Sequence, residues 1–177
     1  LATSETRRGL RPALLGAELP VLEGSIGVTV APLPDGSLLI ATANNGARIL
    51  NSDMQTFTPV PEAWVNMHRG CNLYMAASDH GLYVTKGYQS AFSLTRYELG
   101  GFSRVAESSF AYHANHDRIF FPTLAPNNRV FVVAADAQNI NRDVIICFDA
   151  LTLEKLFVID ETENEDRFSD RPWELAV

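Results

Sequence analysis

Short apolar segments separated by tight-turn residues are the feature that most constrains how this chain folds. The turn sequences at 34–36 (PDG) and 44–46 (NNG) lie between such segments. Proline presets φ, and Asp-Gly and Asn-Gly readily adopt the positive φ values that hairpin turns require. The pattern therefore predicts four short antiparallel strands that follow one another as one meander, at 26–31, 37–43, 47–53 and 54–61.

A similar unit recurs later in the chain. Residues 71–99 contain a strand, an SDHG turn and two further strands, and residues 119–160 form the clearest second copy of the first meander. Self-similarity at a regular spacing is typical of repeat architectures. The segment 101–118 interrupts the period. It is either an insertion or, from Ser109 onward, the beginning of a further unit, and both interpretations stay open at this point.

Residues 119–160, the third repeat along the chain, resemble a known class of repeats. Its sequences VFVVAAD (130–136) and VIICFDALTLEKLFVID (144–160) resemble the blades of β-propellers of the broad WD-repeat and YVTN type. In that resemblance, residues 145–148 match the third strand of a blade, Asp149 closes it, Thr152 lies in the following turn, and residues 155–158 match the outer strand. The first repeat contains a looser equivalent around Asp53 and Thr56.

This resemblance implies an all-β fold, a β-propeller-like array of about three to four four-stranded antiparallel blades. A two-sheet β-sandwich is the alternative. The expected organisation is an N-terminal arm or linker at 1–24, propeller-like blades over 25–160, and an acidic C-terminal segment or the start of a further blade at 161–177. Within the array, the blades are expected at about 25–61, 62–100 and 108–160.

Three to four blades are fewer than most closed rings contain, because propellers usually have about four to eight. Repeat units also depend on their neighbours for stability. We therefore expect either that the chain is part of a longer propeller, which is the simpler interpretation, or that a protein partner or self-association completes the ring.

Two groups of residues suggest a metal site, and each has a simpler interpretation. His113, His116 and Asp117 lie in YHANHD, where the His-x-x-His spacing can present two imidazoles to one ion. The same residues are also ordinary turn chemistry, which we prefer. The alternation of acidic residues over 160–166 resembles the opening of a calcium loop, but a solvated acidic loop is the preferred interpretation because the required Gly and Glu are missing. We expect neither a metal nor another cofactor.

The candidate partner-binding residues are aromatic, basic and histidine side chains in the segments between predicted strands. Aromatic residues and arginine dominate the energetics of protein interfaces. The alternative for Trp64 and Phe92 is that they are core residues between blades. The candidates are Trp64, His68, Arg69, Tyr88 and Phe92.

Composition and charge exclude some functions. The net charge of −7 disfavours nucleic-acid binding, which needs clustered Lys and Arg. No apolar run reaches the roughly 18 residues that a membrane span needs. The two cysteines, Cys71 and Cys147, are interpreted as small core residues, and the sequence contains no Asn-x-Ser/Thr acceptor. These features favour an intracellular location.

The function expected from these observations is a non-catalytic protein-binding scaffold. It would be part of a β-propeller that presents loop faces to partners within a larger protein complex, because the sequence contains regular repeats and no nucleophile elbow, phosphate-binding loop or Cys-x-x-Cys motif. The alternative is a propeller enzyme, a lactonase-like hydrolase or a quinoprotein-like oxidoreductase, whose site is completed by blades outside this chain.

Overall fold

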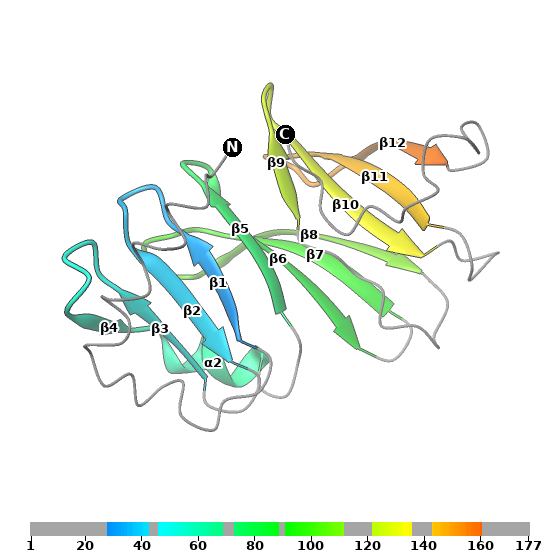
Figure 1. The fold of residues 1–177 in the computed structure, drawn as a ribbon. Coiled ribbons are helices and arrows are strands. Elements are labelled where there is room, and N and C mark those ends of the chain that lie inside the picture. Colours follow the sequence, from blue (N-terminus) through cyan, green and yellow to red (C-terminus); the bar gives the residue numbers. More distant parts are fainter. Residues whose placement is uncertain are drawn as a thin grey trace. The chain divides into compact units, whose positions relative to one another are not determined.

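The computed structural model of the chain describes residues 28–42, 46–68, 73–88, 91–111, 122–135 and 143–160. In this part of the chain, twelve strands form three four-stranded antiparallel sheets, accompanied by one short helix (Figure 1). The prediction of an all-β fold built from propeller-like four-stranded antiparallel sheets is confirmed. The chain divides into two compact units, Leu1–Arg69 and Gly70–Val177, which are described separately.

The first unit contains sheet A, a meander in the order β1-β2-β3-β4, and the helix α2. Apolar side chains on β2 are buried on both faces of the sheet, as the nearly continuous apolar run LLIAT indicates. Gly46, the first residue of β3, has a φ of 87°, a conformation that glycine adopts without a steric penalty. The elements are β1 (Thr29–Pro32), β2 (Leu38–Thr42), β3 (Gly46–Leu50), β4 (Phe57–Pro59) and α2 (Glu62–His68).

The second unit contains two further meanders, sheets B and C. Sheet B consists of β5 (Leu73–Ser78), β6 (Gly81–Tyr88), β7 (Ala91–Tyr97) and β8 (Arg104–Ala111). Sheet C consists of β9 (Thr123–Ala125), β10 (Arg129–Ala135), β11 (Asp143–Asp149) and β12 (Lys155–Asp160). The segment 101–118, which interrupts the repeat in the sequence, begins with the fourth strand of sheet B, because β8 pairs with β7.

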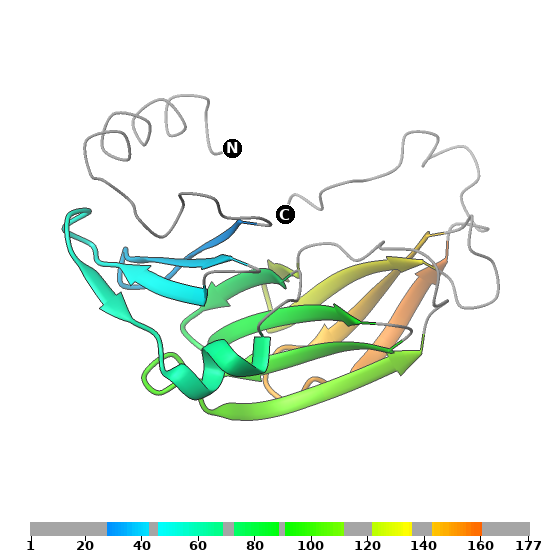
Figure 2. The same ribbon diagram turned by 90° about the horizontal axis from the view of Figure 1, so that it is seen from below.

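Sheets B and C share one hydrophobic core, and Figure 2 shows them as neighbouring layers. Because side chains alternate between the two faces of a strand, one face of each sheet supplies this core. Burial of apolar surface of this kind is the main stabilising term in folding. The core contains Tyr83 and Leu94 from sheet B, and Val130, Val132, Ala134, Val144, Ile146 and Phe148 from the strands of sheet C.

The turn between the third and fourth strands is closed by the same backbone hydrogen bond in all three sheets. An N–H at the first position of the turn donates to a carbonyl five residues later, with the pairs Asn51–Thr56 at 2.9 Å, Glu98–Ser103 at 3.0 Å and Asp149–Glu154 at 2.9 Å. Each turn also contains one non-glycine residue of positive φ, namely Met54 (57°), Phe102 (56°) and Leu153 (59°). The closing hydrogen bond is therefore common to all three sheets. The positive-φ residue is the fifth of the turn in sheets B and C and the fourth in sheet A.

Gly81, at the start of β6, provides a test of the register in sheet B. Its φ is +139°, and a Cβ at this position would lie 2.4 Å from the carbonyl oxygen of Tyr97 on β7. We expect Gly81→Ala to lower the free energy of unfolding by roughly 2 to 4 kcal/mol, because it combines an unfavourable φ with a backbone clash. Urea denaturation measures the difference.

The matched control is Gly100→Ala, because a Cβ on Gly100 meets no atom within 4 Å. We expect this second substitution to change the free energy of unfolding by less than about 1 kcal/mol. Equal effects of the two substitutions would contradict the strand register that places Gly81 against the backbone of Tyr97.

Candidate functional site

The structure places two of the predicted partner-binding residues in the short helix α2. Trp64 and His68 are 3% and 5% exposed, and their rings pack together with centroids 4.4 Å apart and a tilt of 57°. The burial of Trp64 agrees with its alternative interpretation as a core residue. Neither side chain belongs to the exposed surface of the structure. Their role in binding a partner stays a prediction.

The other predicted site residues lie wholly or partly outside the described residues. Tyr88 and Phe92 belong to the paired strands β6 and β7, where the register joins Tyr88 to Ala91 and Phe92 to Gly87. Arg69, Cys71, His113, His116 and Asp117 are outside the described residues. Within the ranges that the structure describes, no group of three or more His, Cys, Asp or Glu side chains is placed to hold a metal ion.

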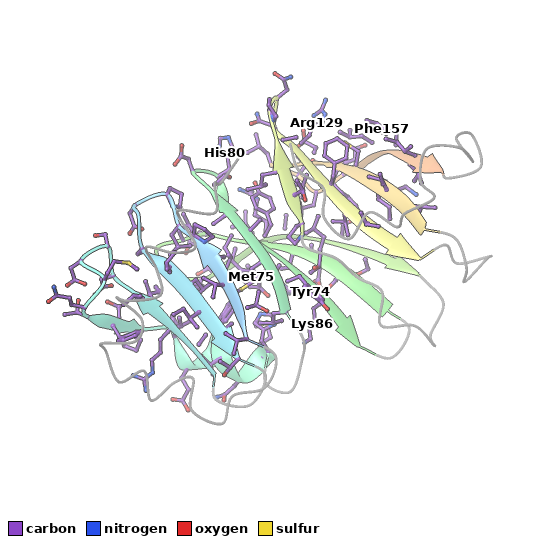
Figure 3. All side chains as sticks on the ribbon, in the orientation of Figure 1. Tyr74, Met75, His80, Lys86, Arg129 and Phe157 are labelled. Atoms are coloured by element: carbon purple, nitrogen blue, oxygen red, sulfur yellow. The ribbon has the colours of Figure 1, made fainter. Side chains whose placement is uncertain are left out.

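The most organised polar surface in the second unit is formed where its turns meet. We call this surface the turn end. It is formed by the β5–β6 turn with His80, the β9–β10 turn with Asn128, and the β11–β12 turn that begins after Asp149. In an antiparallel meander, the turn after the first strand and the turn after the third strand lie at the same end of the sheet. Figure 3 shows His80 and Arg129 toward this end, and Tyr74 and Lys86 toward the other.

A chain of hydrogen bonds joins the turns of the two sheets. The Tyr83 hydroxyl, in the shared core, donates to the carbonyl oxygen of Ala150 at 2.9 Å. The N–H of Ala150 donates to the carbonyl of Asn128 at 2.9 Å. The Asn128 Oδ1 lies 3.1 Å from the Nε2 of His80, and the His80 carbonyl accepts from Arg96 at 2.9 Å. Turns from two sheets are thereby fixed relative to each other.

The sequence provides the backbone conformation that this arrangement needs. Asn127 and Asn128 both have positive φ, 63° and 56°, in the three-residue turn before β10. Asparagine tolerates the left-handed region better than most residues, because its short polar side chain can make local hydrogen bonds. The Asn-Asn pair therefore presents both the carbonyl and the side chain of Asn128 to the neighbouring turns.

Asp149 organises the turn between β11 and β12. Its Oδ1 accepts from the N–H of Leu151 at 2.9 Å, from the N–H of Thr152 at 3.0 Å and from the Thr152 hydroxyl at 3.1 Å. Its Oδ2 lies 3.5 Å from the guanidinium of Arg129. The backbone N–H groups of Thr152 and Leu151, followed by the Thr152 hydroxyl and Arg129, lower the pKa of Asp149 below its ordinary value.

The turn between β3 and β4 uses a similar device, although its aspartate is the third residue of the turn rather than the first. Asp53 accepts from the N–H groups of Gln55 and Thr56 at 2.8 and 2.9 Å and from the Thr56 hydroxyl at 2.6 Å. These bonds, led by that of the hydroxyl, lower the pKa of Asp53 as well. An aspartate followed three residues later by threonine is thus a repeated turn motif of this chain, as the resemblance to propeller blades implies.

The turn end is suited to binding another molecule through polar contacts. It exposes an imidazole, an amide and acidic side chains, with two guanidinium groups half-buried beside them. SDHG was predicted as a turn from the sequence, but His80, Asn128 and Arg129 were not predicted as site residues. The signal available in the sequence was the repeat itself, since turns at equivalent places of adjacent repeats meet at one end.

Comparisons with protein-family models, with curated proteins and with solved structures find no match to this chain. In the described residues, no helix is long and apolar enough to cross a membrane. The fold and the site therefore define the class by themselves: an all-β chain of repeated four-stranded sheets with a hydrogen-bonded turn surface.

The hydroxyl of Tyr83 is the buried link in the hydrogen-bond chain, and its removal tests the connection between the sheets. We expect Tyr83→Phe to lower the free energy of unfolding by about 1 to 3 kcal/mol, because a buried carbonyl of Ala150 loses its donor while the ring still packs. The measurement is urea denaturation, with Ser103→Ala as a control that removes an exposed hydroxyl. An unchanged stability in Tyr83→Phe would show that the bond does not hold the sheets together.

The lowered pKa of Asp149 predicts that its contribution to the free energy of unfolding depends on pH. A carboxylate whose pKa is lowered by folding contributes stability above its unfolded pKa of about 4 and loses it as the pH falls through the folded value. We therefore expect Asp149→Ala to be less stable than the original chain at neutral pH, and the difference to narrow in acid. Urea midpoints at several pH values measure this, and Asp79→Ala, which removes an exposed aspartate of the β5–β6 turn, serves as the control. A difference in stability that does not change with pH would contradict the role of the ionised Asp149 carboxylate in this turn.

Proposed function

We propose that this chain is a non-catalytic protein-binding scaffold that acts within a larger assembly. In this proposal its four-stranded sheets are blades of the WD-repeat or YVTN type, and its turns form a loop face that contacts a partner protein. A partner or a second copy completes a propeller ring. The support for the blade assignment is the backbone hydrogen bond that closes the turn between the third and fourth strands in sheets A, B and C.

The observation that carries the binding role is the hydrogen-bonded construction of the turn end. Loops on a rigid scaffold are where binding residues concentrate. The bonds from Ala150 to Asn128, from His80 to Asn128 and from Arg96 to His80 hold three loop segments in one arrangement before any partner arrives. A surface ordered in advance loses less conformational entropy on binding, which favours affinity.

The residue types at the turn end also suit a protein interface. Arginine is enriched at interface hot spots, and a polar rim with hydrogen-bonding groups is typical of non-obligate complexes. Arg129 is half-buried next to Asp149 and still presents part of its guanidinium to solvent. Such a surface binds by complementary polar contacts, and it requires no bound cofactor.

The proposal is tested by photo-crosslinking in cells of the organism that encodes the chain. A photoreactive amino acid is placed at Asp79, an exposed position of the turn end, and in a second preparation at Thr58, an exposed position on β4. We expect a defined protein partner to be crosslinked from position 79 and not from position 58, because position 58 is on a strand rather than in the turns that build the site.

A variant decides whether the crosslink depends on the proposed surface. Asn128→Ala combined with Arg129→Ala removes the central side chains of the turn end, and we expect it to reduce the crosslink about tenfold. Arg48→Ala, which removes an exposed arginine of β3, is the matched control. A crosslink that survives the double substitution, or no specific crosslink from position 79, would refute the proposed binding face.

A further inference from the structure

Strand β12 has one free edge, because β11 pairs with only one side of it. In the described residues, sheet C has the order β12-β11-β10-β9, so β12 is its outermost strand (Figure 1). Four consecutive apolar residues of this strand are each at least 38% exposed: Leu156, Phe157, Val158 and Ile159. Exposed apolar side chains beside unpaired backbone N–H and C=O groups are a template for pairing with another strand.

The other outer strands carry features that discourage such pairing, and β12 does not. Strand β4 is only three residues long and ends at Pro59, which has no N–H to donate. Strand β8 carries an exposed ion pair between Arg104 and Glu107. In β12 the charged residues are confined to the two ends, Lys155 and Asp160. Because edge strands are usually protected by shortness, proline or charge, the unprotected middle of β12 indicates an interaction surface.

The exposed apolar residues lie on both faces of β12, which points to its edge rather than to a face as the binding site. Residues paired across antiparallel strands share a face. Phe157 is paired with Cys147, and the next residue, Val158, is paired with a residue of the core between sheets B and C, Ile146. Phe157 and Val158 are nevertheless 47% and 44% exposed. A layer packed on one face would cover only one of them, whereas a strand added to the free edge lies beside both.

A bulge in β12 places its two charged positions on the same face. Asp160, Val158 and Lys155 are paired in turn with positions 144, 146 and 148 of β11, which all belong to the core face of sheet C. The register gives Leu156 no partner on β11, so Leu156 is the extra residue of the bulge. Positions 155 and 160 therefore share a face with position 158, and each is two steps from it along the ladder.

We propose that the free edge of β12 pairs with β12 of a second copy of this chain, antiparallel and around a two-fold axis at Val158. Because the bulge takes Leu156 out of the count, Lys155 then lies opposite Asp160 of the second copy. Phe157 lies opposite Ile159 of the second copy, and the axis repeats each pair. Opposite charges and apolar residues in such cross-strand pairs stabilise antiparallel sheets.

The neighbouring symmetric registers match less well, which argues for a specific self-pairing. A two-fold axis at Phe157 would place Lys155 opposite Val158. An axis at Ile159 would place Asp160 opposite Val158. Both arrangements set a charge against an apolar residue and leave it without its counter-charge. Strand β12 is therefore complementary to itself in the register centred on Val158, as a two-fold interface requires.

The proposed contact uses a single strand from each copy, so it is small compared with the roughly 1,200 to 2,000 Å² that stable complexes bury. We therefore expect a reversible dimer rather than a permanent one. This edge is a different surface from the turn end. The inference goes beyond the proposed scaffold function and depends on neither the unidentified partner nor the loop face.

The first test is sedimentation of the full chain at concentrations up to about 0.5 mM, which detects even a weak dimer. We expect a dimer of the 19.5 kDa chain that dissociates on dilution. Lys155→Glu and Asp160→Lys are each expected to raise the dissociation constant about tenfold or more, because each sets like charges opposite one another twice. Mixed in equal amounts, the two variants are expected to form a mixed dimer, because both cross-strand pairs then join opposite charges.

Arg48→Glu is the matched control, since it reverses the charge of an exposed residue of β3 and changes the net charge as Lys155→Glu does. We expect it to leave the dimer unchanged. Far-UV circular dichroism and urea denaturation establish that each variant is folded. A chain that is monomeric throughout the series, or two charge-reversal variants that do not restore each other in the mixture, would overturn the proposal.

A disulfide at the two-fold axis tests the register without reversing a charge. Residues opposite one another in an antiparallel ladder have Cα atoms about 4.5 or 5.5 Å apart, which a disulfide can span. We expect Val158→Cys to form a covalent dimer on oxidation. Val105→Cys, at a position 50% exposed on the edge strand β8, is the matched control and is expected to link no better than the original chain.

The original chain, with its own Cys71 and Cys147, is oxidised in parallel as the reference. Linking at position 158 that does not exceed the linking at position 105 would overturn the two-fold pairing of β12. Failure of the partner crosslink from position 79 leaves this result unaffected, so the two proposals are refuted separately.

Discussion

The packing of sheet B on sheet C is the interaction on which the second unit depends. An antiparallel sheet of four short strands has two faces, and it gains stability only when at least one of them is removed from water. Sheet B meets this requirement with Tyr83 and Leu94, and sheet C with three valines, an isoleucine and a phenylalanine of β10 and β11. Because Tyr83 also donates a hydrogen bond to Ala150, the same contact fixes the β11–β12 turn beside the β9–β10 turn.

The repeated turn explains how such sheets can be made from unrelated residues. Phe102 and Leu153 have positive φ at the same place in sheets B and C, and both side chains are buried although neither residue is favoured in this conformation. Their burial compensates for part of the local strain. The turn is therefore specified by a side chain that reaches the core as well as by turn-forming residues, and the aspartate–threonine bonds of Asp149 and Asp53 reinforce it in two of the three sheets.

The strands of sheet A could be predicted because turn-forming residues act locally in the sequence. The turn end could not be predicted because it depends on contacts between residues far apart in the sequence. The turns at 34–36 and 44–46 predicted β2 and β3 because their residues carry the conformation themselves. Strand β8 was left open, because its RVAESSFA sequence has little apolar alternation and depends on pairing with β7. Helix α2 is too short for a periodic signal, so Trp64 and His68 were interpreted as loop residues although the structure buries them. His80 and Asn128 meet across 48 residues, a contact that only the packing of two sheets creates.

Tyr83 and Phe131 occupy equivalent positions in sheets B and C, but their environments differ. Tyr83 is fully buried, whereas Phe131 is half-buried. The Tyr83 hydroxyl donates to the carbonyl of Ala150, which follows β11 of sheet C. Without this acceptor, burial of the hydroxyl would lower the stability of the fold. Phe131 lacks that hydroxyl and therefore needs no acceptor. Its ring instead makes an apolar edge-to-face contact with Phe157 of the same sheet, with centroids 6.3 Å apart. The same position in two sheets is thus satisfied once by a hydrogen bond between sheets and once by packing within a sheet.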